Sequence, residues 1–478
     1  MSGTPLHCSA YIDGEFRPGG ERRERRNPAT GEVVATFDVA GRETVDRAVA
    51  AAKRAFADWG RTSGFTRGAM FRRLAEITLG RVDELATCVT LEQGKPLDEA
   101  RGEVRKFAEA MRFYGEEAER IHGETVPNES TDYLSVVVRE PVGPVAAITP
   151  WNYPVELIGW KLGGALGAGC TMVIKPSEHT PGAAHLIAGY IGEAGFPPGV
   201  FNVVHGAGET GALLAAHPDI AKLGFTGSNR TGQSLFRTVE GVTQLTMELG
   251  GSCPMIVSRH ADLDLAATGA VRRAFRNAGQ ICIAINRIYV EDAVLGEFVD
   301  RMAELTAALT VTDGFATPDA DVGPVTMEEI RARTAAHVTD AVERGARLVA
   351  GAGGHPAGGL FRNPAIVVGA PHDSLIMTEE TFGPAVGIAG VESLDEAVAH
   401  ANAVAGGLAA YLYTDHLGET MRLGRDLDFG NVAVNSVDAG IINAPYGGRR
   451  ESGFGSEHGR EGLEGYLQYK HLRIRHTH

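Results

Sequence analysis

"VVHGAGETGALLAA", residues 203–216, places three glycines in a G-x-G-x-x-G pattern at positions 206, 208 and 211. A short apolar run precedes the glycines, and an alanine- and leucine-rich segment follows them. A strand, a glycine turn and a helix in this order form the dinucleotide-binding fingerprint of open parallel sheets. The stretch therefore predicts a βα unit and, taken alone, a site for the phosphates of a dinucleotide.

Strand-like and helix-like segments alternate on both sides of this stretch. We expect strands at TMVIKPS (171–177), FNVV (201–204), KLGFTGS (222–228) and PMIV (254–257), and helices near 181–194, near 210–217 and from about 231. This alternation is typical of βαβ units and a parallel sheet. A second alternating series begins after about residue 255 and continues past 430, so the sequence predicts two α/β domains of comparable size.

Other parts of the chain have different periods. Apolar residues at helical spacing predict three amphipathic helices before the alternating part, at 42–59, 66–92 and 97–121. Two β-rich runs follow, 134–139 and 142–149, and Pro141 lies between them. We expect the strand-rich piece at 123–141 and the tail YLQYKHLRIR (466–475) to pair elsewhere, including with another subunit.

Composition excludes several classes of protein. The formal net charge of −15 over 478 residues argues against a nucleic acid or an anionic membrane surface as partner. We find no signal peptide and no apolar run of 18 residues, so we expect no membrane association. The five cysteines are scattered and the 16 histidines form no ligand motif, which predicts a cytoplasmic protein with reduced thiols and no metal site.

Three residues are candidates for covalent chemistry on a carbonyl group. Cys282 lies in the polar, glycine-containing segment FRNAGQICIAINR, although a lone cysteine is more often a small buried hydrophobe. Glu248 follows an apolar strand and precedes two glycines, and Asn152 lies in the rigid loop TPWNYP. A nucleophilic cysteine needs a base and an oxyanion donor, which Glu248 and Asn152 offer. Taken alone, Glu248 is more simply a solvated carboxylate, and Asn152 is more simply a turn residue.

A second group follows the expected strands and suits a nucleotide. Lys175 and Glu178 end one strand, where they could bind ribose hydroxyls or merely stand before a capped helix. Gly227 and Ser228 end another strand at the start of a helix, where backbone N–H groups can bind a phosphate. The segment TEETFGP (378–384) adds two carboxylates and an aromatic ring.

The order of these motifs is more informative than any one of them. Together they resemble the NAD(P)-dependent aldehyde dehydrogenase superfamily over essentially the whole chain. The matching motifs are PWNYP (150–154), KPSE (175–178), FTGS (225–228), ELGG (248–251), GQIC (279–282), EETFGP (379–384) and PYGG (445–448). Three segments look most like the succinate-semialdehyde branch: GKPLDEARGEV (94–104), FRNAGQICIAINR (275–287) and GLAAYLYT (407–414).

The resemblance implies a fold and a domain plan. The fold is α/β, with two Rossmann-like open parallel-sheet domains plus a small β oligomerisation arm. Residues 1–122 and 142–250 would form the NAD-binding domain, 251–449 the catalytic domain, and 123–141 and 450–478 the oligomerisation and bridging segments. A homodimer or homotetramer is the implied assembly.

The resemblance also implies a mechanism. Cys282 matches the nucleophile that attacks the aldehyde carbon, and the Asn152 amide matches the donor to the oxyanion. Glu248 matches the base that activates water to hydrolyse the resulting thioester. Members that pass the acyl group to coenzyme A lack this base. An acylating semialdehyde dehydrogenase and a non-catalytic NAD-binding scaffold protein stay as the alternatives.

The cofactor residues follow in the same way. Lys175 and Glu178 match the pair that binds the adenosine ribose, and Ser228, with Gly227, matches the pyrophosphate contact. Glu380 and Phe382 match residues that hold the nicotinamide ribose and ring, and Trp151 and Lys161 match further residues of the cleft. Since a carboxylate at 178 repels a 2′-phosphate, we expect NAD, with NADP possible because Arg230 is nearby. The glycines at 206–211 would then lie beside the adenine edge, not under the phosphates.

The substrate is less well defined by the sequence. Arg276 matches one arginine that succinate-semialdehyde dehydrogenases use near the substrate carboxylate, but Trp160 stands where the second is expected. Tyr446 would complete an aromatic pocket mouth, and Glu156 nearby could repel an anion or simply face solvent. We therefore expect a small aliphatic or ω-functionalised aldehyde, with succinate semialdehyde as one candidate.

Overall fold

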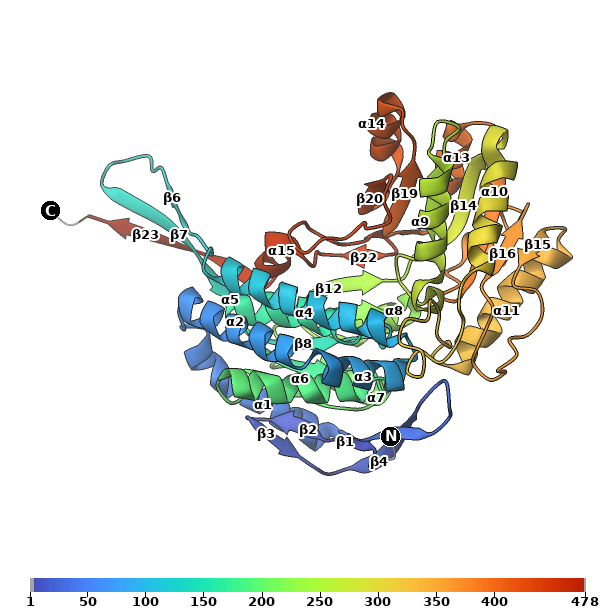
Figure 1. Ribbon diagram of the computed structural model, residues 1–478. Helices are drawn as coiled ribbons and strands as arrows, with labels where there is room; N and C mark the ends of the chain where they lie inside the picture. Colours follow the sequence, from blue (N-terminus) through green and yellow to red (C-terminus); the bar gives the residue numbers. More distant parts are fainter. Residues whose placement is uncertain (1–3, 477–478) are drawn as a thin grey trace.

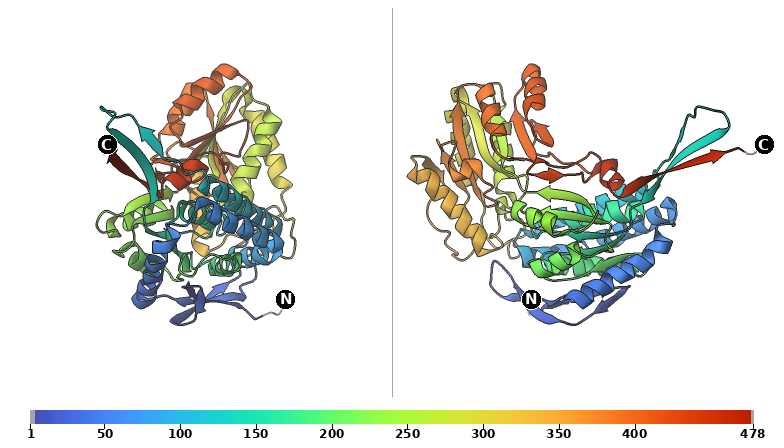
Figure 2. Two further views of the ribbon diagram at one scale, coloured as in Figure 1. Left: turned by 90° about the vertical axis from the view of Figure 1, so that its left-hand side faces the viewer. Right: turned by 180° about the vertical axis from the view of Figure 1, so that it is seen from behind.

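The computed structural model describes residues 4–476; residues 1–3 and 477–478, at the ends of the predicted terminal segments, lie outside the described part. Two lobes are each built on one sheet, and a β arm projects away from both (Figures 1 and 2). The prediction of an α/β fold with two open, mostly parallel sheets and a small β arm is confirmed.

The first sheet has eight strands, in the order β22-β12-β11-β8-β9-β10-β2-β3. Its parallel centre is β12 (Gln244–Leu249), β11 (Lys222–Gly227), β8 (Pro144–Ile148), β9 (Thr171–Lys175) and β10 (Phe201–Val203). Antiparallel strands complete both edges: β22 (Gly453–Phe454) on one side, β2 (Ala10–Ile12) and β3 (Glu15–Arg17) on the other. The chain runs outward from β8 through β9 to β10, then returns to β11 on the other side of β8. Such a reversal leaves a crevice at the carboxyl ends of the central strands.

Both faces of this sheet are covered by helices because its strands are apolar on both sides. In β8, Val145 and Ala147 pack in one cluster and Ala146 and Ile148 in the other, as the two-residue period of a strand requires. The first cluster includes α2 (Gly64–Gly80), α3 (Val82–Gln93), α4 (Leu97–Ala118), α5 (Glu156–Ala168) and α6 (Pro181–Ala194). The second includes α1 (Arg42–Trp59), α7 (Gly208–Ala215) and α8 (Asn229–Thr238).

The second sheet has seven strands and lies in the other lobe (Figure 1). Its order is β15 (Arg347–Ala350), β16 (Ala365–Val368), β17 (Ala385–Val391), β14 (Ile285–Glu291), β13 (Cys253–Val257), β19 (Ala409–Tyr413) and β20 (Asn431–Val434), and only β15 is antiparallel. The accompanying helices are α9 (Leu263–Phe275), α10 (Asp292–Ala307), α11 (Glu328–Glu343), α12 (Leu375–Thr378), α13 (Leu394–Asn402) and α14 (Leu417–Asp426).

The arm joins two segments that are far apart in the sequence. β7 (Tyr133–Pro141) pairs antiparallel with both β6 (Glu124–Val126) and β23 (Leu467–Arg475). The expected pairing of the tail is thus found within the chain. The residues just before the tail are not part of the arm. There, β22 extends the first sheet, and α15 (Gly459–Glu464) packs against α5. A smaller sheet of β1 (Leu6–Cys8), β5 (Val33–Val39) and β4 (Glu21–Arg26) lies at the N-terminal side.

Three sequence-based details were wrong. The expected helix at 66–92 is two helices, α2 and α3, because the backbone leaves the helical region at Arg81 (φ −128°, ψ 28°). The helix expected at 97–121 ends at Ala118. Pro141 does not separate the β-rich runs: it is the last residue of β7, and the chain turns at Gly143, whose φ of 139° suits glycine. None of the described helices is long and apolar enough to cross a membrane.

Candidate functional site

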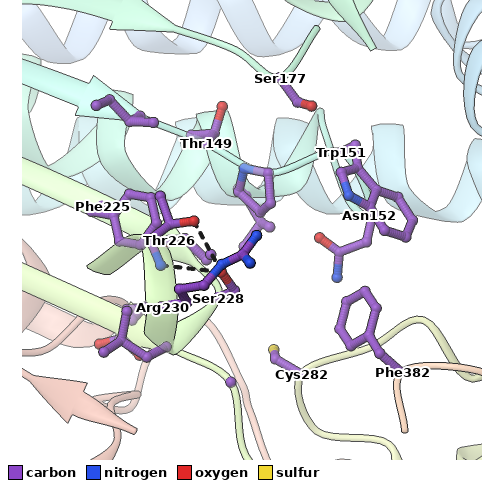
Figure 3. A pocket seen from close by; sticks show the side chains of 18 of the residues that line it. Thr149, Trp151, Asn152, Ser177, Phe225, Thr226, Ser228, Arg230, Cys282 and Phe382 are labelled. Carbon is purple, nitrogen blue, oxygen red and sulfur yellow. Dashed lines mark hydrogen bonds between the residues drawn. The ribbon is translucent and has the colours of Figure 1, made fainter. Parts of the chain in front are cut away.

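A cavity of about 510 Å³ lies at the carboxyl ends of β8, β9, β11 and β12, and loops of the second sheet form its opposite wall (Figure 3). This is the crevice that the strand order leaves open. Twelve of the site residues expected from the sequence line it: Trp151, Asn152, Trp160, Lys175, Glu178, Gly227, Ser228, Glu248, Cys282, Glu380, Phe382 and Tyr446. Lys161 and Arg276 are not among the lining residues.

Cys282 is presented by a loop with an unusual backbone. Asn277, Ala278 and Gly279 have φ of 51°, 54° and 72°, and two of these three are not glycine. Such strain persists only where surrounding contacts impose it. Here the Asn277 amide donates to the carbonyls of Asn152 and Gln280 and accepts from Gln93. The loop is therefore tied to the first lobe, immediately before the thiol.

The thiol itself is half-buried and faces the open space (Figure 3). Its Sγ lies 3.5 Å from the Tyr446 hydroxyl. Burial raises the pKa of Cys282 to about 12, although the bond with Tyr446 acts in the opposite direction. The protonated thiol is thus the dominant form at neutral pH, and it has to lose its proton before the sulfur can attack as a thiolate.

Asn152 projects into the same space from the loop after β8 (Figure 3). Its Nδ2 donates to the Gln280 carbonyl at 3.1 Å, which leaves the second amide hydrogen available. Its backbone carbonyl oxygen accepts from both Lys95 Nζ (2.7 Å) and the Asn277 amide, which fixes the loop, whereas its side-chain Oδ1 has no partner among the described residues. The bond to Gln280 therefore turns the amide nitrogen toward the cysteine loop, where an oxyanion donor is needed.

Glu248 lies at the end of β12 and is 4% exposed. Neither of its carboxylate oxygens has a hydrogen-bond partner among the described residues. Burial raises its pKa well above the usual range, with Glu457 adding to the effect and Lys161 opposing it. Lys161 is itself fully buried and bonded to Glu457 and Thr226. A carboxyl group without partners is free to bind a water molecule or a substrate group.

The far end of the cavity carries polar groups suited to a nucleotide. Lys175 Nζ donates to the carbonyls of Pro176 (2.9 Å) and Gly206 (2.8 Å) and lies 3.7 Å from the Glu178 carboxylate. Ser228 caps α8, accepting from Thr231 N at 3.3 Å, so the positive end of that helix meets the cavity. Gly208 and Gly211 also line the cavity, and their place beside the adenine stays a prediction.

Glu380 and Phe382 enter from the loop after α12. Glu380 accepts from Gly251 N at 3.4 Å, and a Cβ at Gly250 would collide with its carboxylate, which accounts for the first glycine of ELGG. Burial raises the pKa of Glu380 to about 7. The backbone of Phe382 has a φ of 52°, and its ring stands edge-on to the Trp151 ring, with the centroids 5.5 Å apart.

Arg276, expected at the substrate, is bound to another side chain. Its Nε donates to Glu99 at 3.0 Å, and the Tyr153 hydroxyl donates to the same carboxylate at 2.7 Å. Glu156, which could have repelled an anion or faced solvent, is mostly buried and lies 3.6 Å from Lys106. Neither pair was predictable from the sequence, because the partners belong to α4, and no local spacing links that helix to the PWNYP and GQIC segments.

Metal ligands were not expected, yet three side chains of the second lobe form one group. Ligand atoms of His372, Glu396 and His400 all lie within 4.8 Å of one another. None of the three lines the cavity. The absence of a metal from the catalytic site therefore stays a prediction.

A supporting ion pair lies beside the site and was not predicted from the sequence. It involves Lys95, in the segment between α3 and α4. Its ammonium group is fully buried and contacts Glu103 at 2.6 Å, while Glu103 accepts from the backbone N–H groups of Val155 and Glu156. Together with the bond from Lys95 to the Asn152 carbonyl, this pair fixes the PWNYP loop.

We predict that Lys95→Met destabilises the protein by about 3–5 kcal/mol, because the Glu103 carboxylate is left buried without its cation. Urea unfolding followed by fluorescence measures the loss. Lys53→Met is the matched control, since Lys53 pairs with Asp219 at the surface and its loss should cost less than about 1 kcal/mol. The double variant Lys95→Met/Glu103→Gln should recover part of the stability. Equal effects of Lys95→Met and Lys53→Met would refute the assignment.

Comparisons with known proteins show the family to which the chain belongs. The model of the aldehyde dehydrogenase family matches residues 16–472. The chain is 40% identical to 3-sulfolactaldehyde dehydrogenase of Pseudomonas putida, over 98% of this chain and 97% of that protein. It is 39% identical to the NADP(+) succinate-semialdehyde dehydrogenase of Escherichia coli, over 97% of each chain.

A solved structure shows the same fold. The crystal structure of an NAD-dependent aldehyde dehydrogenase from Sinorhizobium meliloti matches with a TM-score of 0.96 at 36% identity, covering 98% of this chain and 95% of that one. The resemblance identified from the order of the motifs is confirmed. This chain belongs to the aldehyde dehydrogenase family and is an NAD(P)-dependent enzyme that oxidises an aldehyde to the carboxylic acid.

Proposed function

We propose that the enzyme oxidises a small aliphatic or ω-functionalised aldehyde, with water as the acyl acceptor and NAD as the preferred cofactor. The observation that carries this proposal is that Cys282, Asn152 and a buried, unpartnered Glu248 line one cavity. Succinate semialdehyde is a candidate substrate, in keeping with the name of the Escherichia coli relative.

Cys282 supplies the nucleophile. Its thiolate forms a bond to the aldehyde carbon, and the carbonyl oxygen becomes an oxyanion. The Asn152 amide and the backbone N–H of Cys282 donate to that oxygen, and their orientation before the reaction lowers the cost of stabilising it. When bound, NAD(P)+ supplies a hydride acceptor, and loss of the hydride from the former aldehyde carbon leaves a thioester on Cys282.

Glu248 completes the cycle. As a carboxylate it takes a proton from a water molecule while the water oxygen bonds to the thioester carbon, and the thiolate of Cys282 leaves. The acid is released, and Glu248 passes its proton to the Cys282 thiolate, which restores the thiol. The proton that the thiol lost before its attack on the aldehyde has gone to the solvent. The low polarity around Glu248 favours this role, because a base whose pKa is raised by burial accepts a proton more readily.

The cavity fits the cofactor at the end away from Cys282. Lys175 and Glu178 offer a donor and acceptors for ribose hydroxyls, and the start of α8 at Ser228 offers backbone donors for a diphosphate. The Glu178 carboxylate disfavours a 2′-phosphate, which supports NAD. Arg230 lines the same cavity, so some use of NADP is compatible with the proposal.

The arm and the cysteines bear on assembly and location. The arm exposes apolar side chains on β23, with Tyr469 71% exposed and Ile474 49% exposed, which supports a homodimer or homotetramer. All five cysteines are free, which is compatible with a reducing compartment and supports the cytoplasm.

An aldehyde panel with NAD or NADP, with and without coenzyme A, tests the proposal. We expect NADH and the free acid in equal amounts, no stimulation by coenzyme A, and a higher kcat/KM with NAD than with NADP. An acyl-CoA product would identify an acylating enzyme instead. Cofactor binding without turnover on any aldehyde would identify a non-catalytic scaffold.

A further inference from the structure

We propose that the aldehyde end of the cavity selects uncharged aldehydes over carboxylated ones, because no lysine or arginine among the described lining residues serves that end, and the neighbouring Arg276 and Lys106 are each paired with a carboxylate of this chain. The inference rests on the proposed function and narrows its substrate class. This preference differs from the substrates in the names of two relatives, because a sulfonated and a carboxylated aldehyde are both anionic.

The basic residues that line the cavity do not serve the aldehyde. Among the described lining residues, the lysines and arginines are Lys175, Arg230 and Arg333. Lys175 is paired with Glu178, and Arg230 stands in the first turn of α8, at the proposed phosphate site. Arg333 donates to the Thr381 carbonyl beside Glu380. All three are thus on the cofactor side.

Arg276, six positions before Cys282 in the sequence, is neutralised by Glu99. The two are 3.0 Å apart, and Glu99 is only 9% exposed, so water screens the pair little. Glu99 also accepts from the Asn277 N–H at 3.2 Å and from the Tyr153 hydroxyl at 2.7 Å. The carboxylate is therefore fixed by three donors, and a substrate carboxylate would have to compete with it for the guanidinium group.

The second cation, Lys106, is more exposed, with 51% of its side chain open to solvent, and it is also paired with a carboxylate. It lies 3.6 Å from Glu156, whose carboxylate is 12% exposed and stands one helical turn before Trp160. The two pairs together add no net charge at this end. An anionic substrate would lose its hydration here without gaining a free cation, whereas an uncharged one would not.

The wall of the aldehyde end is aromatic and fixed. Trp160 packs edge-on against His458, with centroids 4.1 Å apart and planes at 84°, and lies 5.5 Å from the Tyr446 ring. His458 has φ 59°, a conformation that side chains rarely adopt, and bonds to the Ile441 carbonyl at 3.1 Å. Burial lowers the pKa of His458 to about 4, so the imidazole is neutral at physiological pH and adds no positive charge.

The first experiment compares matched aldehydes on the wild-type enzyme with saturating NAD. Succinate semialdehyde is measured against its methyl ester and against pentanal. We expect kcat/KM to be at least about tenfold higher for both uncharged aldehydes, which corresponds to a modest electrostatic difference. An equal or higher value for succinate semialdehyde overturns the inference and leaves the proposed function intact. No NADH with any aldehyde counts against the proposed function instead.

The second experiment removes the negative charge that neutralises Arg276. Glu99→Gln keeps an acceptor for Tyr153 but removes the charge that neutralises Arg276. We expect the kcat/KM of succinate semialdehyde relative to pentanal to rise about tenfold, mainly through KM. The gain should vanish in Glu99→Gln/Arg276→Met. Glu119→Gln, which removes a carboxylate from an exposed pair with Arg72, is the control and should leave the ratio unchanged.

A third variant tests the inference if Glu99→Gln does not fold. Trp160→Arg introduces an unpaired cation directly into the lining, and it should also raise the relative kcat/KM of succinate semialdehyde. An unchanged ratio in both folded variants shows that charge pairing does not determine the substrate.

Discussion

Cys282→Ser is expected to lower kcat for aldehyde oxidation by at least about 10⁴-fold. A serine hydroxyl is a much weaker nucleophile than a thiolate, and the Glu248 carboxyl group is not in a hydrogen bond that would activate it. NADH formation with a substrate aldehyde measures the effect, and binding of NAD shows that the variant is folded.

Cys253→Ser is the matched control. This cysteine is also buried, and its Sγ lies 3.4 Å from the Cys282 carbonyl, but it is absent from the cavity lining. We expect it to keep activity within about tenfold, because a serine can make the same bond. Normal turnover by Cys282→Ser, or a loss in Cys253→Ser as large as that in Cys282→Ser, would contradict the assignment of the nucleophile.

The pH dependence follows from the raised pKa of Cys282, about 12. Below that value the thiolate is the minor form, and its fraction grows as the pH rises. We therefore expect kcat/KM to increase from pH 6 to pH 9, and the same sign holds for Glu248, whose base form is also disfavoured by burial.

Glu248→Gln is expected to separate the two halves of the reaction. The glutamine is nearly isosteric but cannot accept a proton from water, so the thioester should form and persist. We expect about one equivalent of NADH per active site in a rapid first phase, followed by a steady rate about 10²–10⁴-fold below that of the wild type. Stopped-flow absorbance at 340 nm measures both phases.

Hydroxylamine provides the control for this variant. It attacks a thioester without a general base, so it should restore turnover in Glu248→Gln and release a hydroxamate. The same addition should not rescue Cys282→Ser. A Glu248→Gln variant with wild-type steady turnover would show that another group activates the water.

Local patterns were sufficient to predict the α/β class and the central elements of the first sheet. The strands β9 and β11 and the helix α6 follow directly from alternation, from Gly195 after the helix and from Pro181 at its start. The exact break between α2 and α3 did not follow, because Arg81 alone leaves the helical backbone and nothing in its side chain signals this. The pairing of β23 with β7 joins residues more than 300 positions apart, so it could be expected only in general terms.

Twelve of the lining residues were predictable, most of them because they belong to short motifs, whereas Met327, Ile330, Arg333 and Leu408 were not predicted. The supporting contacts were not predictable. Lys95 and Glu103 meet across the start of α4, and Arg276 meets Glu99 from 177 positions away. The second pair depends on how the two lobes approach each other, which no spacing in the sequence encodes. The interpretation of Arg276 as a free cation therefore omitted the carboxylate that the fold brings beside it.

Mass spectrometry of Glu248→Gln after reaction with NAD and an aldehyde tests the central claim most directly. Digestion of the quenched protein should yield the peptide that contains Cys282 with the mass of one acyl group added, and hydroxylamine should remove that mass. NADH formation with no acyl group on Cys282, or with the acyl group on another residue, would contradict the account.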